Sequence, residues 1–159
     1  MRILIVSDSH GRHENLERFV RKTAPIDMMI HCGDAEGREE AIEEIAGCPL
    51  EIVAGNNDFF TTLPKEKEFM VGRYRIFLTH GHYYYISMGP ERLAEEAESR
   101  GVDIVMCGHT HKPMVERING LILVNPGSVS YPRQEGRRPS CVMMELDREG
   151  EAHFTIIYG

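Results

Sequence analysis

Side chains that bind divalent metal ions follow several apolar runs of this chain. Asp8 and His10 come directly after the run Ile3–Val6. Their spacing of two residues places both side chains on the same side of an extended backbone. His109 and His111 have the same spacing and follow a later apolar run. A carboxylate and several imidazoles gathered in this way favour a metal site.

Three further apolar runs also end in polar side chains, so the candidate ligands form a larger set. The set consists of Asp8, His10, Asp34, Asn56, His80, His109 and His111. These ligands are too many for one tetrahedral ion, and nitrogen and oxygen without thiolate suit Mn, Fe, Zn or Ni. The simplest prediction is two metal ions with one bridging carboxylate. Two such ions can bind a phosphate group and generate hydroxide at neutral pH.

Each motif alone has a simpler interpretation. Asp8 is a possible helix N-cap with a surface His10 beside it, and Gly33-Asp34 and Asn56-Asn57-Asp58 are typical of turns. The strongest single motif is the pair His109 and His111, because two imidazoles at this spacing seldom serve packing alone. Five polar tips at successive strand ends favour the metal site over these separate explanations.

The first third of the chain alternates strands and helices. Apolar spacing predicts strands at 3–6, 26–31 and 50–54, a helix that ends near Ala24, and a second helix at 36–46. This β-α-β-α-β order predicts a parallel sheet with right-handed crossovers. Open α/β sheets bind ligands at the carboxyl ends of their strands. The polar tips are therefore expected at one edge.

The remainder of the chain predicts a helix and several hairpins. Strands are expected at 67–71 and 74–79, at 115–118 and 121–124, and at 140–146 and 152–158, with a helix at 90–100, a strand at 102–107 and a loop at 125–128. We therefore expect an α/β fold of two packed sheets, parallel first and antiparallel later, with helices outside. Residues 1–159 are expected to form one domain.

Composition restricts the partners and the location. The 18 Lys and Arg against 25 Asp and Glu give a net charge of -7, which disfavours binding to a nucleic-acid backbone or an anionic membrane. No apolar run is long enough for a membrane span, and Ile3–Val6 is too short for a signal peptide. The four cysteines form no C-x-x-C pair. These features predict a soluble cytoplasmic protein.

The motifs, in their order along the chain, resemble those of the calcineurin-like metallophosphoesterases. They are D-x-H at 8–10, G-D at 33–34, G-N-x-D at 55–58, H-G-H at 80–82 and G-H-T-H at 108–111. The short length and the segment 125–128 resemble the compact YfcE-like phosphodiesterases. The resemblance implies a four-layer αββα sandwich of two mixed sheets and two divalent ions, Mn most often, with Ni, Zn, Fe or Mg as alternatives. It also implies a homodimer or homotetramer.

By this resemblance, each metal ion has its own ligand set. The first set is Asp8, His10, Asp34 and His111, and the second is Asp34, Asn56, His80 and His109. Asp34 would bridge the two ions. The implied reaction is phosphodiester hydrolysis, in which a metal-bridging hydroxide attacks phosphorus in line.

One position departs from the family pattern. The wider family has His where this chain has Asn57, and an amide can donate a hydrogen bond but cannot deliver a proton. We therefore expect Asn57 to contact the substrate phosphate. His82 is either the alternative acid or a histidine that only supports the site or lies on the surface. Diesters with good leaving groups should be hydrolysed best. His13 and Arg12 are candidate phosphate contacts, with surface positions at a helix start as the simpler explanation.

Other interpretations stay open from the sequence. A eukaryotic retromer scaffold subunit resembles this fold, so a protein-binding scaffold is the main alternative to an enzyme. A phosphomonoesterase or a cyclic-nucleotide phosphodiesterase would share the same site. Arg133, Arg137 and Arg138 either attract an anionic ester or belong to a solvated loop. His31 is expected to pack beneath the site, and Asp58 is expected to orient backbone or a ligand.

Overall fold

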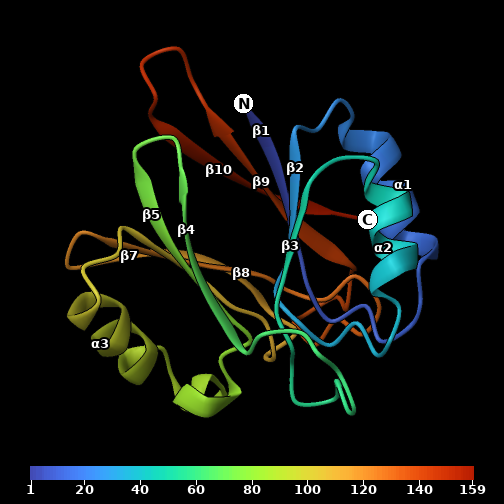
Figure 1. The fold of residues 1–159 in the computed structure, drawn as a ribbon, viewed down its shortest axis with the longest axis horizontal. Coiled ribbons are helices and arrows are strands. Elements are labelled where there is room, and N and C mark those ends of the chain that lie inside the picture. The colour runs from blue at the N-terminus through green and yellow to red at the C-terminus, as the bar shows by residue number, and fades with distance from the viewer.

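The computed structural model describes residues 1–159 and contains two five-stranded sheets packed face to face (Figure 1). The first sheet has the order β10-β9-β1-β2-β3, and the second has the order β4-β5-β6-β8-β7. The strands are β1 (Arg2–Val6), β2 (Met28–His31), β3 (Leu50–Ile52), β4 (Glu66–Val71), β5 (Tyr74–Thr79), β6 (Ile104–Met106), β7 (Pro113–Ile118), β8 (Leu121–Pro126), β9 (Ser140–Leu146) and β10 (Ala152–Tyr158). Helices α1 (Glu14–Thr23) and α2 (Glu39–Ala46) cover the first sheet, and α3 (Glu91–Ser99) covers the second. The predicted αββα sandwich of two mixed sheets is confirmed.

Side chains alternate between two kinds of core along each central strand. In β1, Ile3 and Ile5 pack between the sheets, whereas Leu4 and Val6 pack beneath α1 and α2. In β5, Phe77 faces α3 in the same way. Because both faces are covered, the central strands contain continuous apolar runs, such as residues 3–6 in β1 and Ile104–Met106 in β6. This rigid double layer supports the loops that follow the strands.

Both sheets combine parallel and antiparallel pairs. The residue pattern alone had predicted parallel strands early in the chain and antiparallel strands later, and this order is corrected. β1, β2 and β3 are parallel, and so are β5, β6 and β8. β4, β7, β9 and β10 add antiparallel pairs. The second half of the chain is therefore not purely antiparallel, because the segment through α3 returns β6 parallel to β5.

Several element boundaries also differ from those predicted. Asn125 and Pro126 belong to β8 rather than to a loop, because pairing with β7 extends as far as Pro126. α2 begins at Glu39, since Glu36 and Gly37 have positive φ angles of 56° and 73°. Two short 3-10 helices, His82–Tyr84 and Ile86–Met88, were not predicted.

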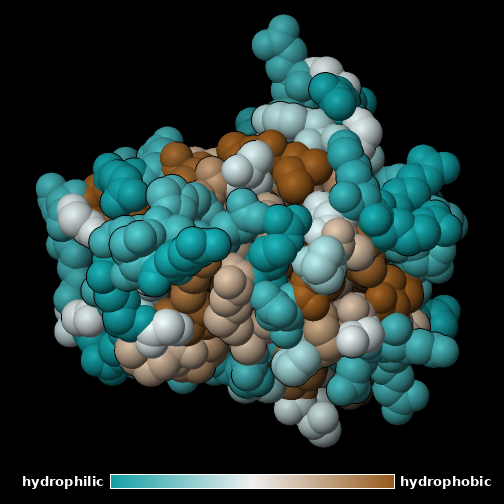
Figure 2. Space-filling model, turned by 90° about the horizontal axis from the view of Figure 1, so that it is seen from above, coloured by the Kyte–Doolittle hydropathy of each residue, from teal (hydrophilic) through white to brown (hydrophobic).

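The carboxyl ends of the parallel strands lie at one end of the molecule, at the bottom of Figure 1. The N-terminus and the turns of the β4-β5 and β9-β10 hairpins lie at the opposite end. Figure 2 views that opposite end and shows hydrophobic areas separated by hydrophilic side chains. No helix has both the length and the apolar character needed to cross a membrane.

Candidate metal centre

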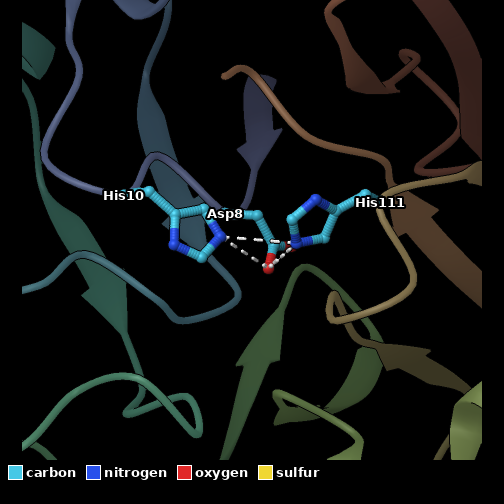
Figure 3. A group of neighbouring side chains, drawn as sticks. All are labelled: Asp8, His10 and His111. Atoms are coloured by element: carbon cyan, nitrogen blue, oxygen red, sulfur yellow. Dashed lines mark hydrogen bonds and ion pairs between the residues drawn. The ribbon is translucent and has the colours of Figure 1, made fainter. Parts of the chain in front are cut away.

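Three side chains from two distant segments form the first ligand group. Asp8 and His10 follow β1, His111 follows β6, and the two imidazoles approach the Asp8 carboxylate from opposite sides (Figure 3). Nε2 of His111 lies 3.0 Å from Oδ1 of Asp8, and Nε2 of His10 lies 3.8 Å from the same oxygen. The two Nε2 atoms are 3.3 Å apart.

The other ring nitrogen of each histidine fixes its tautomer. Nδ1 of His10 lies 2.7 Å from a carboxylate oxygen of Glu36, and Nδ1 of His111 lies 2.6 Å from the backbone oxygen of Tyr131. Both oxygens can only accept, so each Nδ1 carries the proton. Nε2 is consequently the ring nitrogen that can offer a lone pair to a metal ion in the site. Histidine ligands of metal ions are commonly oriented in this way.

A cation fits this arrangement. Two lone pairs 3.3 Å apart repel each other unless a positive charge lies between them. Oδ1 of Asp8 is fully buried and has no hydrogen-bond partner, although buried polar atoms are normally paired. A divalent ion would supply the missing partner to all three atoms.

The second ligand group adjoins the first. Nε2 of His80 lies 3.5 Å from Oδ2 of Asp34 and 3.0 Å from Oδ1 of Asn56. The same Asn56 oxygen lies 3.0 Å from Nδ1 of His109. Nδ1 of His80 donates to the backbone oxygen of Cys32 at 2.7 Å, so Nε2 is the ring nitrogen of His80 that faces the carboxylates.

The structure thus brings all seven predicted ligands together in one cluster. Asp34 Oδ2 lies 3.7 Å from Nε2 of His10 and 3.5 Å from Nε2 of His80, so it stands between the two predicted ligand sets. Asp8 stands between them as well, since its Oδ1 lies 3.8 Å from Nε2 of His80. Bridging by Asp34 stays a prediction.

The buried carboxylates give the cluster a negative field. Burial raises the pKa of Asp8, but the adjacent imidazoles of His111 and His80 outweigh it and leave the pKa below its ordinary value. Burial likewise opposes ionisation of Asp34, and His80 and Asn57 reverse this effect. Burial lowers the pKa of His80, yet the two carboxylates raise it to about 9. The cluster therefore favours positive charge.

Unusual backbone geometry turns the ligands toward one another. Five of the seven have left-handed φ angles between 46° and 68°, namely Asp8, His10, Asp34, His109 and His111. Such strain is rare for residues other than glycine and concentrates at functional sites. Two glycines allow the loops to approach closely. A Cβ on Gly55 would lie 2.1 Å from Oδ1 of Asp34, and one on Gly108 would lie 2.0 Å from Oγ of Ser7.

Residues 57 and 58 hold the Asp34 loop. The backbone N–H and the side-chain amide of Asn57 donate to the Asp34 carboxylate at 2.9 and 2.8 Å. Asp58 accepts from the backbone N–H groups of Asp34, Glu36 and Gly55 at 2.6–2.8 Å. The expectation that Asp58 orients backbone is confirmed. Asn57 contacts a ligand, and its phosphate contact stays a prediction.

The remaining predicted residues are His82, His13 and Arg12. The His82 ring is 5.4 Å from that of His80, and its buried Nδ1 has no hydrogen-bond partner. His13 precedes α1, with its Nε2 buried and unpartnered. Arg12 is exposed and lies over the Tyr131 ring at 4.8 Å, while that ring packs edge-on against His10 at 5.3 Å. Arg12 is thus near the first ligand group through Tyr131.

Four residues that support the ligands were not identified from the sequence. Glu36 and Tyr131 hold the rings of His10 and His111. The Asn125 side chain donates to the backbone oxygen of Gly108 at 2.8 Å, and Ser128 Oγ donates to that of Asp8 at 2.8 Å. A polar residue directly after an apolar run was the available signal for Asn125. His31 is buried as expected and contacts Ser9 and the Gly33 N–H.

Comparison with known sequences identifies the family. The model of the calcineurin-like phosphoesterase superfamily domain matches residues 1–149. The probable metallophosphoesterase YsnB of Bacillus subtilis is 36% identical over 152 residues, which cover 94% of this chain and 86% of YsnB. Phosphodiesterase YfcE of Escherichia coli is 29% identical over 173 residues, covering 92% and 89% of the two chains.

Solved structures show the same fold. A conserved uncharacterized protein of Streptococcus pneumoniae, described as a predicted phosphoesterase, is 26% identical with a TM-score of 0.80. The match covers 99% of this chain and 97% of that protein. A single mutant of Vps29 from Entamoeba histolytica is 23% identical, also with a TM-score of 0.80, and covers 100% and 99%. Fold and site together define a metallophosphoesterase. The chain belongs to the calcineurin-like phosphoesterase superfamily.

Proposed function

We propose that this protein is a metal-dependent phosphodiesterase. The observation that carries the proposal is the convergence of three imidazole Nε2 atoms on the buried carboxylates of Asp8 and Asp34. Two divalent ions, both proposed to be Mn²⁺, would activate water and neutralise charge on the transferred phosphoryl group. The names of the relatives YsnB and YfcE support hydrolysis of phosphate esters.

The chain's own residues restrict the substrate. The Asn57 amide is held on Asp34 and carries no titratable proton, so it can orient an oxygen but cannot protonate a leaving group. General-acid assistance is commonly worth about 10²–10⁴ in rate. Diesters whose leaving groups have a low pKa are therefore the proposed substrates, with His82 as the nearest imidazole outside the ligand set.

Hydrolysis of two nitrophenyl esters tests this proposal. The protein is stripped with chelator and then supplied with Mn²⁺, Ni²⁺, Zn²⁺ or Mg²⁺ before bis-p-nitrophenyl phosphate and p-nitrophenyl phosphate are compared. Metal-dependent release from the diester with little release from the monoester is the expected result. Faster release from the monoester would indicate a phosphomonoesterase instead.

A protein-binding scaffold is the second candidate, because the fold matches that of Vps29 over the whole chain. The same assay separates the two. Bound metal without turnover of either ester would favour the scaffold. The complete set of seven ligands supports the enzyme, since binding of a protein partner does not require two adjacent groups of metal ligands.

A further inference from the structure

A basic pocket opens directly beside the first ligand group. It has a volume of about 520 Å³ and shares His10 and His111 with that group. Its remaining lining residues are Glu36, Tyr131, Pro132, Arg133 and Arg137. Ligand pockets are commonly of this size, so the space can hold a substituent as large as a nucleoside next to a phosphate at the metal centre.

The two arginines of this pocket have no anionic partner within the protein. The ion pairs of the chain's other arginines and lysines involve residues 2, 67, 73, 75 and 100, and neither Arg133 nor Arg137 forms one. Glu36 is the one carboxylate in the pocket, and its oxygen already accepts from His10. The pocket is thus locally basic in a chain whose net charge is -7.

The loop that carries these arginines is tied to the metal centre. The N–H of Arg133 donates to the backbone oxygen of His111 at 3.0 Å, and the backbone oxygen of Tyr131 accepts from Nδ1 of His111 at 2.6 Å. Arg137 has a left-handed φ of 43° and donates its N–H to Gln134 at 3.0 Å. The bonds of Tyr131 and Arg133 hold the loop beside the ligand His111, and the bond of Arg137 closes a turn within the loop.

We infer that Arg133 and Arg137 bind a second phosphate group of the substrate, carried by the substituent that fills this pocket. The inference rests on the proposed function and deepens it. A guanidinium group binds a phosphate through two parallel hydrogen bonds. The preferred substrate is then a phosphodiester in which a nucleoside-sized substituent carries a further phosphate, and a diester without that phosphate leaves both arginines unpaired.

A matched pair of chromogenic diesters tests the inference. The substrates are the p-nitrophenyl ester of thymidine 5′-phosphate and the same ester with an added 3′-phosphate. We expect the added phosphate to raise kcat/KM of the Mn²⁺-loaded protein about tenfold or more, as charge-assisted hydrogen bonds of ordinary strength would give. In the double variant Arg133→Gln/Arg137→Gln the ratio between the two substrates should fall to about one.

Arg138→Gln is the matched control. Arg138 lies in the same loop, but its guanidinium faces the Tyr158 ring at 5.3 Å and donates to the backbone oxygen of Gly159. The control also removes a positive charge, so it should keep the wild-type ratio. An equal loss of the ratio in Arg138→Gln would show that only overall charge matters and would overturn the inference.

A binding measurement separates this inference from the proposed function. Calorimetry compares thymidine 3′,5′-bisphosphate with thymidine 5′-monophosphate in the wild-type protein and in the double variant. Tighter binding of the bisphosphate, lost in the double variant, supports the inference even if no ester is hydrolysed. Equal affinity of the wild type for both nucleotides overturns it, even if the diesterase activity is present.

Discussion

At the scale of single residues, buried polar groups hold the metal ligands in place. Asp58 is the clearest case, because its carboxylate accepts from three backbone N–H groups that shape the Asp34 loop. His31 has a similar function beneath the site. The Gly33 N–H donates to its Nδ1, so its Nε2–H donates to Ser9 Oγ, and the ring thereby joins the two loops that carry Asp8 and Asp34.

Replacing Asp58 should destabilise the fold through these N–H groups. In Asp58→Ala all three donors lose their partner, and we expect the free energy of unfolding of the metal-free protein to fall by about 3 kcal/mol or more. Asp58→Asn keeps an acceptor oxygen and should cost less. Urea denaturation measures both. A loss below about 0.5 kcal/mol, as for a neutral surface substitution, would contradict this role.

His31 should make the metal-free protein less stable in mild acid. Burial lowers the pKa of His31 from 6.5 to about 4, which keeps the folded ring neutral. The unfolded chain binds a proton first as pH falls below 6.5, so this contribution to stability is complete above pH 6.5 and is lost toward pH 4. The lowered pKa corresponds to a loss of about 3 kcal/mol in the free energy of unfolding over this pH range.

The comparison with His31→Gln isolates this contribution. The difference in unfolding free energy between wild type and variant should shrink as pH falls from 6.5 to 4. An NMR titration of the His31 ring in the wild-type protein measures the pKa directly. A value near 6.5 would refute the explanation.

At the scale of elements, the loops after the strands were only partly predictable. Apolar runs located nearly every strand, and the polar tips located the seven candidate ligands, because strand ends meet at one edge of a sheet. The left-handed backbone at Asp8 and His111 could not be predicted, because their backbone groups bond to Gly33 and Arg133, which are distant in the sequence. The same holds for the support that Glu36 and Tyr131 give to His10 and His111.

Close packing of these loops makes Gly108 sensitive to substitution. A Cβ there would lie 2.0 Å from Ser7 Oγ and 2.7 Å from Oδ2 of Asp8. Gly108→Ala should therefore displace Asp8 and weaken Mn²⁺ binding about 10- to 100-fold, the usual effect of disturbing the support of a ligand. Calorimetric titration with Mn²⁺ measures the loss.

Gly47→Ala is the control for backbone effects. Gly47 ends α2 at φ 60° with no atom within 4 Å of an added Cβ. Its replacement should cost about 1 kcal/mol of stability, because an L side chain is strained at this left-handed φ, and should leave Mn²⁺ affinity unchanged. Equal affinities of the Gly108→Ala variant and the wild type would show that the loop tolerates the displacement.

At the scale of the whole molecule, two halves of the chain must be assembled before the site exists. The ligands follow strands of both sheets, with Asp8 in the first and His80 and His111 in the second. The unfolded chain cannot gather these ligands, so metal binding should stabilise the folded state. The order of the motifs along the chain predicted this assembly. The residue pattern did not predict the parallel pairs of the second sheet, which arise because the segment through α3 returns β6 parallel to β5.

Mn²⁺ should therefore raise the unfolding midpoint. At a free concentration 100 times the dissociation constant, each occupied site adds about 2.7 kcal/mol. Thermal unfolding with Mn²⁺ or chelator measures the effect, and His153→Gln is a suitable control because His153 pairs with Asp147 on the surface. A midpoint that does not depend on Mn²⁺ would contradict a metal centre.

The most direct test of the dinuclear phosphodiesterase combines metal content and diester hydrolysis in Asp34→Asn, with His111→Gln for comparison. Asp34 stands between the two predicted ligand sets, whereas His111 belongs to one. We predict two Mn²⁺ ions and turnover in the wild type, partial loss in His111→Gln, and fewer ions with a more complete loss of turnover in Asp34→Asn. Asp34→Asn protein that retains both ions and most of its activity would contradict the proposal.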